Sequence, residues 1–413
     1  MDFANKRKIA IAGAGPAGIM AAITSAARGL ETTVFERNRA PGKKLLITGK
    51  GRCNFTNSAD TKQLIDNIPG NGSFLFSAFN SYGSSEIVNF FESNGVAIAV
   101  ERGGRIFPAS GEASDILKAL VDAALQLNVN FLFNSRVKSA IVEKGAISSV
   151  ILENDLEVGC DALIIAVGGL SYPSTGSTGD GYEIASHLGH SIVDGRPALV
   201  PLIVEEHWAR DLQGLSLRNI SVRFLDPVGR IIYKDFGEML FTHFGISGPV
   251  ILSGSIHLAR CGFKGSAVFI DLKPALSEDR LDARLQRDFV EFSRKIFINS
   301  LDELLPQSMI PVIVKLSGID PEKPVNQITK DERLNLGYLL KNLKLNITGS
   351  RGFDEAIITS GGVSVKEINP RSMESKIVKG LYFAGEVIDV DGYSGGYNLS
   401  VAFSTGHAAG SSC

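Results

Sequence analysis

The chain has 413 residues, and its 42 Lys and Arg against 44 Asp and Glu give a formal net charge of −2. This length predicts two or three domains, and 44% hydrophobic with 21% charged residues excludes a disordered, coiled-coil or collagen-like chain. The near-neutral charge predicts no nucleic-acid partner, because dedicated nucleic-acid binders carry a clear basic excess.

Cysteine spacing and hydropathy predict a cytoplasmic protein. The four Cys, at positions 53, 160, 261 and 413, form neither a C-x-x-C pair nor a zinc motif, which is typical of a reducing compartment. No run of about 18 apolar residues indicates a transmembrane helix. The six His show no metal-like clustering with acids. We therefore expect no membrane contact and no metal.

The chain opens with a predicted strand, helix and strand. Residues 8–12 (KIAIA) form an apolar run typical of a buried strand, residues 16–29 are rich in Ala up to Gly29, and residues 32–36 (TTVFE) favour a second strand. This order is the βαβ unit of a parallel sheet.

The next segment, residues 37–80, has little periodicity and predicts an ordered loop with short turns. Periodicity then resumes. Helices are expected at 84–93 and 112–128, and strands at 130–134, 139–143, 147–152 and 161–169.

The pattern changes near Gly195. Residues 199–273 predict short strands, with a hairpin turn at Asp226-Pro-Val-Gly229, and residues 277–343 predict helices. Strands and glycine loops return after Leu345, with a last strand at 380–388 and a final helix at 399–410.

The fold class is therefore α/β, with a Rossmann-like nucleotide-binding domain made of both chain ends. We expect this domain to comprise residues 1–194 and 345–413. Residues 195–344 then form an inserted substrate domain, with a β part at about 195–275 and a helical part at about 276–344.

The first motif is GAGPAG at residues 13–18, a G-x-G-x-x-G between the first strand and the first helix. Gly13 permits the tight turn, Gly15 lets the backbone approach a pyrophosphate, and Gly18 lets the helix pack on the strand. Glu36 ends the second strand, where an acid binds ribose hydroxyls. The motif predicts dinucleotide binding; the alternative is a glycine turn before an ordinary helix.

The C-terminal stretch favours FAD over NAD. A strand runs into Gly385-Glu386, where the carboxylate can reach a ribityl hydroxyl. The segment GYSGGYNL at 392–399 leads straight into the last helix, whose N-terminus suits the N1–C2=O edge of a flavin. The alternative is a glycine-rich loop that only caps the helix.

A basic segment, KKLLITGKGRCNFTN, follows the second strand. Its cations either meet phosphate, flavin or a substrate carboxylate, or form a solvated loop; they are Lys43, Lys44, Lys50 and Arg52. Cys53 is either a redox thiol or a packed residue beside the cofactor.

Seven stretches resemble the bacterial BaiN/YhiN-type flavoproteins, a family of NAD(P)/FAD-dependent oxidoreductases that includes aminoacetone oxidase-like enzymes. They are GAGPAG (13–18), GKGRCNFTN (49–57), GGRIFP (103–108), GGLSYPSTGSTGDGY (168–182), FTHFGISGP (241–249), TSGGVSVKEINPRSMESK (359–376) and GLYFAGEVIDVDGYSGGYNLSVAFSTG (380–406).

This resemblance implies an FAD domain of two-dinucleotide-binding type with an inserted domain that contains a β-barrel and helices. It also implies which residues lie along FAD. They are Gly13, Gly15, Pro16, Ala17, Gly18, Glu36, Arg37, Lys44, Arg52, Cys53, Asn54, Val137, Gly168, Gly385, Glu386, Gly396, Tyr397, Asn398 and Leu399.

Two segments are candidates for substrate contact. Residues 171–182 (SYPSTGSTGDGY) are rich in hydroxyls and glycine, so they either bind an anion or line the flavin cavity, or else form a loop that crosses between domains. His243, in FTHFGISGP, is either a proton-transfer residue or a structural turn residue.

The sequence thus predicts an FAD-dependent oxidoreductase that acts on a small molecule bound between the two domains, by hydride transfer at flavin N5. NADH or NADPH is the expected transient donor, although no second glycine motif or paired Cys follows residue 18. One alternative is an oxidase of a small amine that uses O₂. A second, from another class, is a flavin-binding partner in RNA modification or assembly.

Overall fold

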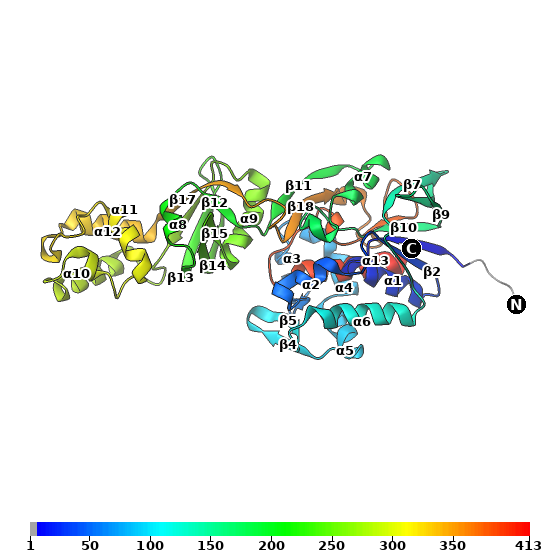
Figure 1. The fold of residues 1–413 in the computed structure, drawn as a ribbon, viewed down its shortest axis with the longest axis horizontal. Helices are drawn as coiled ribbons and strands as arrows, with labels where there is room; N and C mark the ends of the chain where they lie inside the picture. Colours follow the sequence, from blue (N-terminus) through cyan, green and yellow to red (C-terminus); the bar gives the residue numbers. More distant parts are fainter. Residues whose placement is uncertain (1–5) are drawn as a thin grey trace. The chain divides into compact units, whose positions relative to one another are not determined.

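The structure is a computed structural model that describes residues 6–413 (Figure 1). The chain divides into two compact units. The first runs up to Pro197 and resumes at Phe353–Cys413, and the second is Ala198–Gly352. Within the described residues, no helix is long and apolar enough to cross a membrane.

The first unit contains a parallel five-stranded sheet. Its central strands are continuous apolar runs that are buried on both faces, as a parallel sheet covered by helices requires. The sheet confirms the predicted Rossmann-type α/β class. In spatial order its strands are β19 (Leu381–Phe383), β10 (Ala162–Ile165), β1 (Lys8–Ala12), β2 (Glu31–Glu36) and β6 (Asn130–Phe133).

Two helices from opposite ends of this unit's sequence pack against each other: α1 (Pro16–Ala27) and α13 (Tyr397–Ser412). Glycine makes the close approach possible. A Cβ on Gly406 would lie 2.3 Å from the Ala17 carbonyl oxygen, and one on Gly410 would lie 2.4 Å from that of Ala21. The C-terminal helix is therefore part of the nucleotide-binding core.

Three smaller sheets complete the strands of the first unit. They are β7 (Val137–Glu143), β8 (Ala146–Leu152) and β9 (Glu157–Gly159); β3 (Thr56–Asn57), β5 (Arg105–Pro108) and β4 (Ile98–Glu101); and β11 (Ile192–Ala198) with β18 (Ile358–Val363). Its other helices are α2 (Lys43–Ile47), α3 (Thr61–Asp66), α4 (Phe76–Ser81), α5 (Ser84–Ser93), α6 (Ala113–Gln126) and α7 (Asp180–His187).

The prediction of only loops and turns over residues 37–80 is wrong, because α2, α3 and α4 lie there. Each has five or six residues, which is too short for a helical period to emerge from the sequence. A local signal was nevertheless present for α3. Asp60 and Gln63 form a capping box at its N-terminus.

The second unit contains a closed six-stranded antiparallel barrel. Its strands, in order around the barrel, are β12 (Leu202–Val204), β15 (Gly245–Ser247), β14 (Ile231–Thr242), β13 (Ser216–Leu225), β16 (Ala267–Asp271) and β17 (Leu343–Ser350). The predicted turn joins β13 to β14, and the Asp226 side chain accepts hydrogen bonds from the amides of Val228 and Arg230.

Five helices accompany the barrel: α8 (Trp208–Asp211), α9 (Pro249–Cys261), α10 (Glu278–Glu291), α11 (Ile310–Ser317) and α12 (Lys330–Lys341). Helix α9 falls inside the stretch predicted as strands, 199–273. Barrel strand β17 follows the helical part and pairs with both β12 and β16. Because this strand closes the barrel, the compact unit ends at Gly352, whereas the sequence placed the boundary at 344.

Candidate dinucleotide site

The loop between β1 and α1 combines one open and one crowded glycine. A Cβ on Gly15 would have only the Ala166 carbonyl oxygen nearby, at 4.0 Å. A Cβ on Gly18 would lie 1.9 Å from the carbonyl oxygen of Gly13. Gly18 therefore serves close packing within the protein. Gly15 instead borders space that a ligand backbone or phosphate can enter.

Helices α1 and α13 both begin without a side-chain cap, at Gly15 and Gly396. Side-chain caps occur at α3, α10 and α12, through Asp60, Ser277 and Thr329, whereas other helices such as α7 and α9 also begin at a glycine without one. Uncapped first-turn N–H groups and the positive end of the helix dipole suit an anion. The two helix ends that the sequence assigned to the cofactor thus have the donors that a pyrophosphate and a reduced flavin ring require.

The buried carboxylate of Glu36 holds the end of β2 against the glycine loop. It accepts hydrogen bonds from the Ala14 amide (2.8 Å) and from the amide and side chain of Asn38 (2.8 and 2.7 Å). A carboxylate has about four acceptor positions, so one remains for a ribose hydroxyl.

Arg37, next along the chain, is held by protein partners. Its guanidinium pairs with Asp180 at 3.2 Å, and Arg136 also binds this carboxylate, at 2.8 Å. Burial alone raises the pKa of Asp180, but the hydrogen bonds from Arg136 and Thr178 outweigh it and lower the pKa below its usual value. Arg37 and Asp180 thus form a structural ion cluster beside the adenosine end of the predicted site.

A second polar cluster joins four segments of the first unit. Lys44 donates to Glu386 (2.7 Å) and to the Ser171 hydroxyl (2.8 Å), while Ser171 donates to Glu386 (2.6 Å). The Thr359 amide also donates to this carboxylate, at 2.8 Å. Three donors leave Glu386 one acceptor position, which is the capacity that a ribityl hydroxyl needs.

Two predicted glycines border this cluster, and both have a positive φ. A Cβ on Gly168 would lie 3.9 Å from a carboxylate oxygen of Glu386, and one on Gly385 would lie 2.8 Å from the Ala17 Cβ. Gly385 therefore connects the Glu386 cluster to the first turn of α1. The structure brings the N-terminal and C-terminal glycine motifs together, as a single extended dinucleotide requires.

The basic segment packs against the start of α13. A Cβ on Gly396 would lie 2.2 Å from the carbonyl oxygen of Thr56, and the Asn54 side chain donates to this carbonyl at 2.8 Å. Arg52 forms an ion pair with Glu101 and lies over the Phe107 ring, 4.3 Å from its centroid.

Cys53 is fully buried, and burial raises the pKa of its thiol to about 12. The thiol is therefore protonated at neutral pH, which makes it a poor nucleophile. This favours the packing alternative for Cys53.

The other predicted cofactor residues also lie in the first unit. Asn398 accepts from the Gly392 amide and donates to its carbonyl, both at 2.8 Å, so it shapes the loop before α13. Tyr397 and Leu399 are half-buried in the first turn of α13. Val137 is buried at the start of β7.

His243 belongs to the second unit. It is exposed in the turn between β14 and β15, with its ring edge-on to Phe244 at 4.9 Å between centroids. The imidazole is therefore accessible from solvent.

The sequence did not single out several polar residues around Glu36, Arg37 and Glu386. Ser171 and Asp180 fall in the stretch 171–182, which was a candidate as a whole and not residue by residue. Thr359 begins a stretch that carried the family resemblance, and Asn38 had no signal apart from its place after Glu36.

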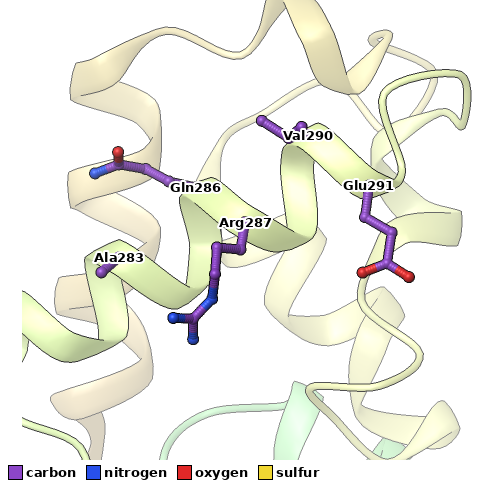
Figure 2. A pocket seen from close by; sticks show the side chains of 5 residues that line it. All are labelled: Ala283, Gln286, Arg287, Val290 and Glu291. Atoms are coloured by element: carbon purple, nitrogen blue, oxygen red, sulfur yellow. The ribbon is translucent and has the colours of Figure 1, made fainter.

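A separate shallow hollow lies on one face of α10 in the second unit. Figure 2 shows its five lining side chains, all from this helix, and none is a predicted site residue; they are Ala283, Gln286, Arg287, Val290 and Glu291. We assign it no function.

The fold and the two glycine motifs define a Rossmann-type dinucleotide-binding protein. Comparison with known proteins identifies its family. Residues 7–412 match the HI0933-like protein Rossmann domain. The chain therefore belongs to the HI0933-like family of FAD-dependent flavoprotein oxidoreductases, which confirms the resemblance noted from the sequence.

Two relatives align over nearly the full length. The chain is 32% identical to the 3-dehydro-bile acid delta(4,6)-reductase of Clostridium scindens, over 98% of both chains. It is 31% identical to the ribosomal RNA dihydrouridine synthase of Escherichia coli, over 96% of both chains.

Solved structures share the fold at lower identity. The 3-ketosteroid delta1-dehydrogenase of Sterolibacterium denitrificans has a TM-score of 0.54 at 13% identity, covering 98% of this chain and 99% of that one. The 3-ketosteroid-delta4-(5alpha)-dehydrogenase of Rhodococcus jostii has a TM-score of 0.52 at 16% identity, covering 100% and 98%.

Proposed function

We propose that this protein is an NAD(P)H-linked flavin reductase that saturates a ring C=C bond conjugated to a carbonyl. The observation that carries the proposal is the chemistry shared by the names of its relatives. A 3-dehydro-delta(4,6) substrate has its double bonds in conjugation with a ketone. Dihydrouridine is uridine whose C5=C6 bond, conjugated to the C4 carbonyl, has been saturated.

The reaction adds a hydride to one carbon and a proton to the other, and it consumes one NAD(P)H. Bound FAD supplies the two-electron carrier between the nicotinamide and the substrate. In the proposed assignment, the α1 N-terminus and Glu36 would hold the pyrophosphate and ribose, and Glu386, paired with Lys44, would orient the ribityl chain.

We assign the proton to His243. It is exposed, and an imidazole exchanges protons near neutral pH, whereas the Cys53 thiol is buried and protonated. Under this assignment, the same addition of a hydride and a proton would act on both substrate classes, a small enone and a uracil base.

The test is an anaerobic redox titration of the purified flavoprotein. NADH or NADPH is expected to bleach the flavin absorbance, and 2-cyclohexen-1-one is then expected to restore it with formation of cyclohexanone. Cyclohexene is the matched control, because its double bond is not conjugated and should restore nothing. Bleaching by a small amine but by neither NADH nor NADPH, with peroxide formed when O₂ is then admitted, would contradict the proposal and support an amine oxidase instead.

A further inference from the structure

Four side chains form one row across the outer face of the barrel. The registers of neighbouring strands place Lys234 on β14 opposite Arg223 on β13, Arg223 opposite Phe269 on β16, and Phe269 opposite Lys344 on β17. Val222 and Phe224, on either side of Arg223, are buried, so the row faces outward. We call Lys234, Arg223, Phe269 and Lys344 the basic row.

The cations of the basic row have no carboxylate partner among residues 6–413. Lys234 and Lys344 are exposed, and the half-buried Arg223 donates to the neutral amide oxygen of Asn342 and lies over the Phe269 ring, 5.5 Å from its centroid. Three positive charges are thus aligned without protein counter-charges.

Acids close to the row have partners of their own. Asp271 binds Lys341 at 2.7 Å, Glu238 lies 4.0 Å from Arg218, and Glu206 accepts hydrogen bonds from Asn346, two positions along β17 from Lys344. The neighbouring Asp235 alternates to the opposite face of β14, where it accepts a hydrogen bond from Tyr233. The local charge of the face is therefore positive although the whole chain is near neutral.

This alignment is unfavourable for the protein alone, because like charges directly opposite on paired strands repel each other. An anionic ligand along the row would relieve that repulsion. With neighbouring strands about 4.8 Å apart, the row spans roughly 14 Å, which matches a short stretch of phosphodiester backbone.

An aromatic side chain accompanies the cations. Phe236 is 58% exposed, two positions along β14 from Lys234 and on the same face, opposite Ser221. An exposed ring beside a basic track is the arrangement on which single-stranded nucleic acids stack their bases. A lipid headgroup would use the charges, but it has no base to stack on an exposed ring.

We propose that the basic row and Phe236 bind the backbone and a base of single-stranded RNA, which docks the strand carrying the uracil substrate. This proposal rests on the proposed function, since it takes the RNA uracil as the substrate class. It replaces the sequence-based expectation of no nucleic-acid partner.

The test measures binding of a fluorescein-labelled 12-nucleotide oligouridine to the full-length flavoprotein by fluorescence anisotropy, from 50 to 300 mM KCl. The variant Lys234→Glu/Lys344→Glu is expected to weaken binding at least tenfold at 100 mM KCl. The slope of log K against log salt should become shallower by about 1.4, since each lost phosphate contact on a single strand removes about 0.7.

The matched control is Arg294→Glu/Lys315→Glu, which changes the net charge equally at two exposed positions of the helical part. It should keep the wild-type slope. Phe236→Ala is expected to weaken binding by about 5- to 150-fold through lost stacking. Val290→Ala, which truncates an exposed apolar side chain on α10 (Figure 2), should not.

Equal losses in the two charge variants would refute the assignment of the surface. Absence of oligouridine binding by the wild type would refute the RNA partner, as would binding only to vesicles of phosphatidylserine and phosphatidylcholine. The wild-type enone titration described above is independent of RNA, so its success or failure reports separately on the reductase function.

Discussion

Gly15→Val separates cofactor binding from folding. In the structure Gly15 has φ −82° and ψ 179°, an extended conformation that valine adopts readily, and a Cβ there would have a single neighbour at 4.0 Å. The loss of a favourable N-cap residue, about 1 kcal/mol, is offset by about 0.4–1 kcal/mol from the more restricted unfolded chain. The apo protein should therefore keep its stability within about 1 kcal/mol.

Flavin binding should respond very differently. The valine side chain would fill the space through which a pyrophosphate approaches the α1 N-terminus. Losing two charge-assisted hydrogen bonds there costs about 3–6 kcal/mol, which raises the Kd for FAD by about 10²- to 10⁴-fold. The variant should purify colourless, with an apo Tm within about 2–4 °C of the wild-type apo protein.

Gly159→Val provides the matched control in the same unit. Its Cβ would also have a single neighbour, the Ser148 carbonyl oxygen at 4.0 Å, without a positive φ. It should retain flavin, as judged by the ratio of 450 to 280 nm absorbance and by titration of FAD into apo protein. Full flavin content in Gly15→Val, or equal flavin loss in Gly159→Val, would refute the assignment of the phosphate loop.

Three further predictions concern other residues. Asp180→Asn should lower the free energy of unfolding by about 2 kcal/mol at pH 7. Because the pKa of Asp180 is lowered in the folded state, the stabilisation by its carboxylate is present above about pH 4 and is lost in more acid solution. The urea unfolding curves of the variant and the wild type should therefore converge at acid pH. Under native conditions at pH 8, iodoacetamide should alkylate the exposed Cys261 before the buried Cys53, Cys160 and Cys413, and early modification of Cys53 by mass spectrometry would contradict its raised pKa. His243→Gln should leave flavin content and reduction by NAD(P)H unchanged but slow reoxidation by 2-cyclohexen-1-one about 100-fold in stopped flow; an unchanged reoxidation rate would remove His243 from the proton-transfer role.

The parts of the fold that the sequence predicted well are those with long or unambiguous patterns. Strand β1 and helix α5 have the predicted bounds, because an unbroken apolar run and an amphipathic turn pattern each extend over the whole element. The sequence did not predict helices α2, α3 and α4, because each has fewer than two turns. The sequence predicted strands in place of helix α9, because this helix is apolar and interrupts a series of strands.

The site was predictable only where backbone geometry demands glycine. Gly15 and Gly18 follow from the spacing of one motif, whereas the Lys44–Glu386 pair joins residues that are 342 positions apart. Ser171 and Thr359, which complete that cluster, carry no pattern of their own. Net charge says nothing about where charges lie, since a sum of −2 is compatible with three cations that the barrel register places in one row.

The contact between α1 and α13 also has a consequence for biosynthesis. Helix α1 leaves the ribosome long before the glycine-lined face of α13 that covers it. Until then the Ala-rich surface of α1 and the neighbouring sheet lack their partner, so the nascent polypeptide has to avoid aggregation for most of its translation. The predicted dinucleotide site, which uses the N-termini of both helices, is therefore complete only after α13 has been synthesised.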